Sequence, residues 1–198
     1  DLLVEDEATL DRIIATISRR AAFHSEDEAM LRARANLRRH GDPSSHPVWR
    51  NEEAALTATQ RLVRLAEKHG KRVHVLHVSS ALEMEFLATA KDVATVETLP
   101  QFLTFAGPQI YERLKGLAQM NPPIRYAHDL AMLWSLGISQ GVVDVIGTDH
   151  APHTLSEKAE PYPNSPSGMT GVQTLVPVML DHVNAGRLKL LGIGRATR

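Results

Sequence analysis

The segment from Ile146 to His153 concentrates side chains that could bind a metal ion and transfer a proton. Asp149 follows a strongly apolar run, and His153 comes shortly after it, behind Pro152. Carboxylate oxygen and imidazole nitrogen are suitable ligands for Zn²⁺, and a carboxylate beside a metal-bound water can take its proton. An aspartate that caps a helix before a turn has a similar local pattern. The segment therefore favours a metal-dependent hydrolytic site, with the capping role as the alternative.

Two further histidines, His24 and His77, stand in a comparable context. Each follows a short apolar run, which begins at Ala21 for the first and at Arg72 for the second. A single histidine at the end of a strand is most often a structural residue whose nitrogens are satisfied by neighbours. Strand ends that carry His, His and Asp together favour a metal site more strongly, although the pattern alone leaves both interpretations open.

The elements expected around these residues alternate between helices and strands. Apolar residues at i, i+3, i+4 and i+7 favour helices, and short apolar runs bounded by turn residues favour strands. Helices are predicted at 7–19, 26–39, 51–69, 81–90, 128–140 and 172–184, strands at 21–24, 72–79, 93–99 and 142–148, and long loops at 104–124 and 154–171. The strands are too continuously apolar for a half-solvated sheet, which predicts a parallel α/β arrangement of about four βα modules.

This alternation places the three candidate ligands, His24, His77 and Asp149, at one edge of the sheet. In parallel α/β folds the loops after the strands converge at the carboxyl edge, where active sites assemble. The other histidines are expected to have structural or solvated roles. His74 alternates away from His77 and is expected to pack against helices. Solvent-facing positions are expected for His40, His46, His69, His128 and His182, and His150 is given no role in binding.

Composition excludes several classes of protein. The chain has 198 residues, of which 43% are hydrophobic and 23% charged, and its formal net charge is −1. That balance is typical of a globular protein and lacks the basic excess expected of an electrostatic nucleic-acid binder. No apolar run approaches the roughly 18 residues of a membrane span. With no cysteine, the chain can bind a metal only through histidine and carboxylate.

Several motifs, read in chain order, resemble those of the dihydroorotases, a family of cyclic amidohydrolases. The run GTDHAPHT at 147–154, followed by Glu157-Lys158, is similar to the family's strand-eight signature. The runs FHSE at 23–26 and LHVSS at 76–80 resemble the segments that carry its strand-five and strand-six metal histidines. Two further resemblances are NPPIR at 121–125, a substrate-contacting segment, and PSGMTG at 166–171, a loop over the ligand.

The resemblance implies a TIM-type (β/α)₈ metal-dependent hydrolase barrel. We expect the chain to form a partial barrel domain over 1–198, about the second half, with strands five to eight. The implied reaction is the reversible, zinc-dependent cyclisation of N-carbamoyl-L-aspartate to dihydroorotate and water in pyrimidine biosynthesis. The implied enzyme is cytoplasmic, acts on a small molecule rather than on nucleic acid or membrane, and forms a homodimer or associates with aspartate transcarbamoylase.

The resemblance also implies a role for individual residues. His24 and His77 would bind one zinc ion of a binuclear pair. Asp149 would bind the other zinc ion and act as general base and acid. The expected substrate-binding residues are Asn121, His153, Ser167 and Gly168, with His153 near a substrate carboxylate and the last two acting through main-chain hydrogen bonds.

Two elements of the family pattern are absent from these 198 residues. The family has a His-x-His pair on strand one and a bridging carboxylated lysine or aspartate on strand four, and the chain contains no His-x-His string. The run Pro100-Gln101-Phe102 also departs from the family's usual Pro-His-His or Pro-Gln-His. We therefore expect that the isolated chain neither holds a normal binuclear centre nor catalyses at a normal rate.

Two alternatives to a dihydroorotase remain. One is a related cyclic-amide hydrolase, such as a hydantoinase or an allantoinase. The other is a non-catalytic dihydroorotase-like subunit that scaffolds aspartate transcarbamoylase. Such subunits usually lose metal ligands, so the presence of His24, His77 and Asp149 disfavours this second alternative.

Overall fold

Four parallel strands form the central sheet of the chain, for which a computed structural model describes residues 3–190. The strands are β1 (Ala21–Phe23), β2 (Val73–Val75), β3 (Ala94–Thr98) and β4 (Val145–Ile146). The sheet order is β1-β2-β3-β4, so consecutive strands are also neighbours in space. Each neighbouring pair is parallel, which requires a crossover connection. The predicted parallel α/β arrangement is therefore confirmed.

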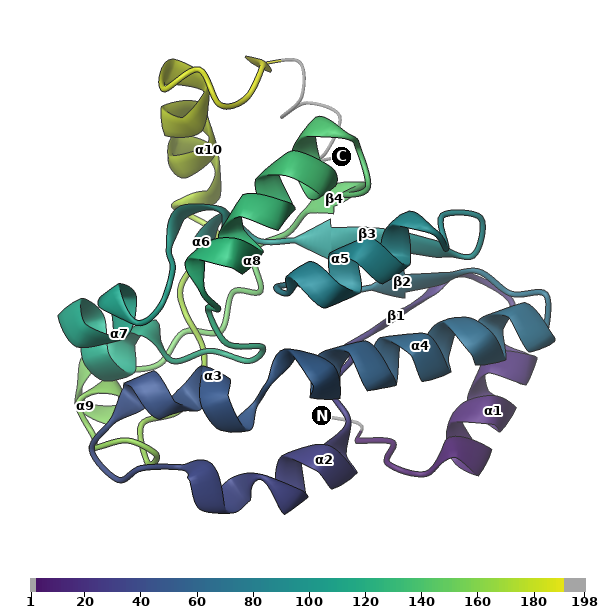
Figure 1. Cartoon of the computed structure of the whole chain (residues 1–198), viewed down its shortest axis with the longest axis horizontal. Coiled ribbons are helices and arrows are strands. Elements are labelled where there is room, and N and C mark those ends of the chain that lie inside the picture. The colour runs from purple at the N-terminus through teal and green to yellow at the C-terminus, as the bar shows by residue number, and fades with distance from the viewer. Residues whose placement is uncertain (1–2, 191–198) are drawn as a thin grey trace.

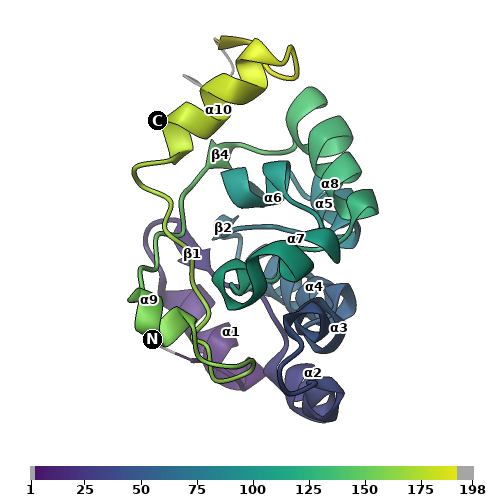
Figure 2. The same ribbon diagram turned by 90° about the vertical axis from the view of Figure 1, so that its left-hand side faces the viewer.

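Helices connect the strands and cover one face of the sheet. The longer helices are α1 (Glu7–Thr16), α4 (Glu52–Lys68), α5 (Ala81–Ala88) and α10 (Leu175–Asn184). The shorter ones are α2 (Glu28–Ala33), α3 (His46–Trp49), α6 (Pro100–Thr104), α7 (Gln109–Leu114), α8 (Ala127–Met132) and α9 (Leu155–Lys158). The 3₁₀ helices are η1 (Ala35–Leu37), η2 (Pro43–Ser45) and η3 (Lys115–Ala118), and η4 (Leu133–Ser139) is a π-helix. Helices α4, α5 and α8 lie along one face of the sheet (Figures 1 and 2). Across residues 3–190, no helix has the length and apolarity to cross a membrane.

Helix α4 shows how local sequence sets the limits of an element. At its start, the Asn51 side chain accepts a hydrogen bond from the N–H of Ala54. At its end, Gly70 adopts a φ of +61°, which favours glycine because it has no Cβ. Between these caps, Leu65 and its apolar neighbours are buried in the core between the helices and the sheet. The predicted helix therefore agrees with the structure at both ends.

The two faces of the sheet differ in character. Val73 and the other residues of β2 and β3 that point toward the helices are buried, whereas His74, Thr95 and Glu97 lie between them on the opposite face and are half-buried. His74 Nδ1 lies 2.8 Å from Thr95 Oγ1, and its Nε2 lies 3.7 Å from Glu97 Oε2. The expectation that His74 packs against helices is therefore wrong. The alternation of the strand stops before His77, whose φ of +38° turns the chain out of the extended conformation.

Several predicted limits of helices and loops are wrong. The predicted helix 26–39 divides into α2 and η1, and the predicted helix 128–140 continues from α8 into the π-helix η4. The predicted loops 104–124 and 154–171 contain α7, η3 and α9. Helix α9 begins with a capping box between Thr154 and Glu157. The sequence contains this capping box, but the turn residues around it favour a loop.

The predicted strands 72–79 and 142–148 shorten to three and two residues. In β4 the reason is local. The carboxylate of Asp144 accepts the N–H of Val96 at 2.8 Å, so a side chain replaces a main-chain carbonyl at the start of this pairing. The rest of this apolar run is explained by packing in the core rather than by strand pairing.

Candidate active site

His24 and His77 converge at the carboxyl ends of β1 and β2. Phe23 pairs with Val75 in the sheet, so the two histidines follow neighbouring strands at the same edge. His24 Nδ1 lies 3.1 Å from His77 Nε2. A zinc ion that binds two imidazole nitrogens at about 2.0–2.1 Å each can occupy such a pair. The structure therefore brings these two candidate ligands together in an arrangement that fits one metal ion.

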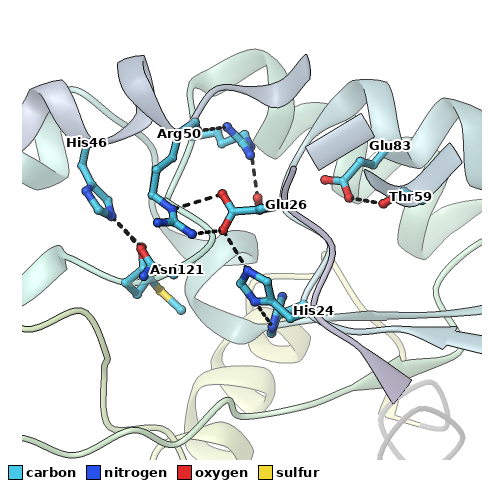
Figure 3. Close-up of polar contacts among 11 residues, drawn as sticks. His24, Glu26, His46, Arg50, Thr59, Glu83 and Asn121 are labelled. Carbon is cyan, nitrogen blue, oxygen red and sulfur yellow. Dashed lines mark hydrogen bonds and ion pairs between the residues drawn. The ribbon is translucent and has the colours of Figure 1, made fainter. Parts of the chain in front are cut away.

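The carboxylate of Glu26 orients His24 from the other side of the ring. His24 Nε2 lies 3.0 Å from Glu26 Oε2, and Glu26 also pairs with Arg50 (Figure 3). The Glu26 side chain is 1% exposed. Burial by itself would raise its pKa, but the bonds and charges of His24 and Arg50 outweigh burial and lower the pKa to about 2. A charged Glu26 accepts a hydrogen bond from His24 Nε2, so in the neutral form of His24 the lone pair lies on Nδ1, the atom that faces His77.

His77 is shielded from solvent. It is 5% exposed, and burial together with the nearby His24 lowers its pKa to about 4. The ring is therefore neutral near pH 7, which is the form that binds a metal. Its main-chain N–H points to Glu97 Oε1 at 3.3 Å. Its Nδ1 has no hydrogen-bond partner among residues 3–190.

Asp149 follows β4 at the same edge, in an unusual backbone conformation. Its φ is +42°, and His77 also has a positive φ, so two of the candidate ligands occupy a region that non-glycine residues rarely adopt. Burial raises the pKa of Asp149, Glu97 raises it further, and His24 opposes the rise. Within residues 3–190, no three His, Asp or Glu side chains lie close enough together to hold a metal ion. Asp149 therefore does not join the His24–His77 pair in one ligand cluster.

Asn121 and Ser167 line one cavity of about 390 Å³. The cavity is bordered by α3 and by the segments around residues 119–121 and 162–167, and Arg50 also faces it. The structure thus brings together two of the predicted substrate-binding residues, beside the arginine that pairs with Glu26. Their role in binding remains a prediction.

His153 and Gly168 lie close together, beside the loop that borders this cavity. His153 Nε2 lies 3.2 Å from the carbonyl oxygen of Ser167. The N–H of Gly168 donates to the carbonyl of Gln119 at 2.9 Å, so this main-chain donor is already engaged within the chain. Gly168 has a φ of +146°, and a Cβ there would lie 2.6 Å from the carbonyl oxygen of Ala151. Only glycine fits this close approach.

Two histidines that were expected to face solvent are buried. His46 is 2% exposed because α3 packs its ring between Trp49 and Tyr162. His182 is 3% exposed, because its ring packs against Trp134 and its Nε2 lies 3.0 Å from Thr104 Oγ1. These two expectations are wrong. His40 and His128 are exposed as expected, and His69 is half-buried beside Asp11.

Glu26, Arg50 and His46 are site residues that the sequence did not reveal. A carboxylate two positions after a candidate ligand was a visible signal for Glu26, since such ligands commonly donate to a carboxylate. Arg50 and His46 had no comparable local signal, because the groups that they contact are distant in the sequence.

Lys158 ties the loop over the cavity to the segment that carries Asn121. It is 7% exposed, and its Nζ donates to the carbonyls of Gln119, Pro166 and Gly168 at 3.0, 2.8 and 3.0 Å. Lys158→Met should remove all three hydrogen bonds and lower the free energy of unfolding by about 2 kcal/mol. Amide hydrogen exchange should also become faster over residues 158–168. Glu160→Gln, an exposed change in the same loop, is the control, and equal exchange in the two variants would contradict this role of Lys158.

Comparisons with known proteins find sequence relatives and solved structures that the chain resembles. No family model matches the chain. Curated relatives do match. The chain is 32% identical over 199 residues to the dihydroorotase of Methanosarcina acetivorans, an alignment that covers 93% of this chain and 42% of the relative. The dihydroorotase of Brevibacillus brevis is 33% identical over 177 residues, covering 84% and 40%. The chain is homologous to the dihydroorotases.

Solved structures agree with this homology at the level of fold. The L-hydantoinase (dihydropyrimidinase) from Arthrobacter aurescens matches 100% of this chain and 46% of its own, with a TM-score of 0.91 and 25% identity. The dihydropyrimidinase from Brevibacillus agri NCHU1002 matches with a TM-score of 0.86 and 22% identity. The chain thus has the fold of part of the TIM-type barrel of these neighbours, as predicted. It spans less than half the length of the dihydroorotase relatives described above.

Proposed function

We propose that this chain belongs to a zinc-dependent dihydroorotase, which interconverts N-carbamoyl-L-aspartate and dihydroorotate. The observation that carries the proposal is the His24–His77 pair, with its facing nitrogens 3.1 Å apart and His24 oriented by a buried carboxylate. The pair lies at the sheet edge where active sites of parallel α/β folds assemble. Homology to dihydroorotases supports this reaction over other cyclic-amide hydrolyses.

Each site residue then has a defined task. His24 and His77 would hold a zinc ion, which supplies Lewis-acid polarisation of the ring carbonyl when it is bound. Asp149 would take the proton from the attacking water and deliver it to the ring nitrogen that leaves. Its raised pKa suits a group that both accepts and donates a proton. Asn121 and His153 would donate hydrogen bonds to the substrate carboxylates.

A comparison of substrates tests this proposal. The zinc-loaded protein is assayed with dihydroorotate, hydantoin and allantoin, and the rates are compared at equal concentrations. We expect dihydroorotate to be hydrolysed fastest. Preferred hydrolysis of hydantoin or allantoin would contradict the proposal. Co-purification with a transcarbamoylase, together with no hydrolase activity, would support the scaffolding alternative.

The zinc content of the isolated chain is a second prediction. The described residues offer one histidine pair and no cluster of three ligands, so we expect fewer than two tightly bound zinc ions per chain. Elemental analysis after dialysis against zinc-free buffer measures this number. Rates of dihydroorotate hydrolysis should be correspondingly low. Two tightly bound zinc ions with full activity would show that the chain needs no further ligands.

A further inference from the structure

His46 lies at the centre of a buried chain of hydrogen bonds that ends at Asn121. Its Nε2 lies 3.0 Å from the carbonyl oxygen of Met120 and 3.0 Å from Asn121 Oδ1 (Figure 3). On the other side of the ring, Nδ1 lies 3.3 Å from the hydroxyl of Tyr162. That hydroxyl accepts the indole N–H of Trp49 at 2.7 Å. The ring therefore links two aromatic side chains to the predicted substrate-binding amide.

The neighbours of His46 determine which ring nitrogen carries the proton. A main-chain carbonyl can only accept, so Nε2 beside Met120 must carry a hydrogen. The indole of Trp49 can only donate, so the Tyr162 hydroxyl accepts from it and has its own hydrogen free for His46 Nδ1. His46 is thus a neutral ring with its hydrogen on Nε2.

This tautomer determines how the Asn121 amide is oriented. Because Nε2 donates, the atom of Asn121 that faces it must be the oxygen. The NH₂ group then points away from His46, and no hydrogen bond found among residues 3–190 uses it. Asn121 and His46 both line the 390 Å³ cavity. The free donor is thus available to a ligand in that cavity.

We propose that His46 is a positioning residue that holds the Asn121 NH₂ group toward the cavity as a donor to a carboxylate or carbonyl oxygen of the substrate. The inference rests on the proposed function, in which Asn121 contacts substrate. The opposite amide orientation would present an oxygen to the substrate carboxylate and repel it. His46 therefore determines whether the substrate carboxylate meets a hydrogen-bond donor or an acceptor of Asn121.

The surroundings of His46 keep the ring neutral over the working pH range. Burial lowers its pKa to about 4, and the charge of Arg50 lowers it as well. The hydrogen bonds to Asn121 and Met120 and the charge of Glu26 act in the opposite direction but are smaller. A protonated ring would place a hydrogen on Nδ1, toward the Tyr162 hydroxyl, whose own hydrogen would then need another acceptor.

Two variants of His46 test the positioning role by kinetics. His46→Gln keeps an N–H donor that can reach Asn121, whereas His46→Phe keeps the ring but loses the donor. We expect His46→Phe to raise KM for dihydroorotate about tenfold, as for the loss of one hydrogen bond, with kcat within about twofold. His46→Gln should restore most of the affinity. Equal KM values for His46→Phe and the unaltered chain, or no rescue by glutamine, would overturn the proposal.

Ring-nitrogen NMR of the unaltered chain supplies a readout that does not depend on activity or on the folding of a variant. With ¹⁵N-labelled histidine, His46 should show the Nε2–H tautomer and no titration between about pH 5.5 and 8. The Nδ1–H tautomer, or titration near the ordinary pKa of about 6.5, would overturn the proposal. Preferred hydrolysis of hydantoin or allantoin would contradict the proposed function instead, while the NMR result would still decide how His46 orients Asn121.

Discussion

Asp149→Asn should lower the rate of dihydroorotate hydrolysis by a factor of about 10² to 10⁴, the usual range for the loss of a general acid or base. Asparagine has nearly the same shape as aspartate but cannot take up or deliver the proton. It also tolerates a positive φ better than most residues, so the backbone at φ +42° should be retained. The effect should appear in kcat measured on the zinc-loaded protein.

An exposed aspartate provides the matched control for this substitution. Asp181 lies on the surface of α10 and makes the same chemical change possible away from the site. Asp181→Asn should leave kcat unchanged within about twofold, and both variants should unfold at temperatures close to that of the unaltered chain. If Asp149→Asn retained more than a tenth of the activity, Asp149 would not be the proton-transfer group.

Glu26→Gln is the second substitution with a large expected effect, and it acts on zinc affinity. Glutamine removes the negative charge that accepts from His24 Nε2 and that balances Arg50. Loss of such a carboxylate behind a histidine ligand typically weakens metal binding by about 10- to 100-fold. Competition with a chelator measures this change. Glu67→Gln, on the exposed face of α4, is the control, and equal zinc affinities would contradict the orienting role of Glu26.

The same substitution should change how stability depends on pH. The pKa of Glu26 falls from 4.5 to about 2 in the folded chain, a shift that corresponds to about 3 kcal/mol of stability. Because the folded pKa is depressed, this contribution is present above pH 4.5 and is lost as the pH falls toward 2. The difference in unfolding free energy between the unaltered chain and Glu26→Gln should therefore shrink as the pH falls through this interval.

The sequence predicted the parts of the site that depend on local context. His24 and His77 each follow a short apolar strand, and parallel strands bring their ends to one edge, so the amino-acid pattern alone is enough to predict that they meet. The parallel α/β arrangement could be predicted for the same reason, because it requires only strand periodicity and the geometry of parallel sheets. The partial barrel, in contrast, was implied only by the resemblance to the dihydroorotases.

Contacts between distant segments could not be predicted. His46 was expected to face solvent because α3 is too short for a periodic signal, and the tyrosine that covers it lies 116 residues away. Arg50 reaches Glu26 across 24 residues for a similar reason. The residue types of His77 and Asp149 also do not reveal the positive φ values that these two residues adopt.

The location of zinc in crystals of the chain tests the central claim most directly. The claim is that His24 and His77 form a zinc-binding pair at the carboxyl edge of the sheet. Anomalous diffraction at the zinc edge, from crystals grown with zinc, should show the ion about 2.0–2.1 Å from His24 Nδ1 and His77 Nε2. Zinc bound only at other histidines, such as His69 beside Asp11, would contradict the claim.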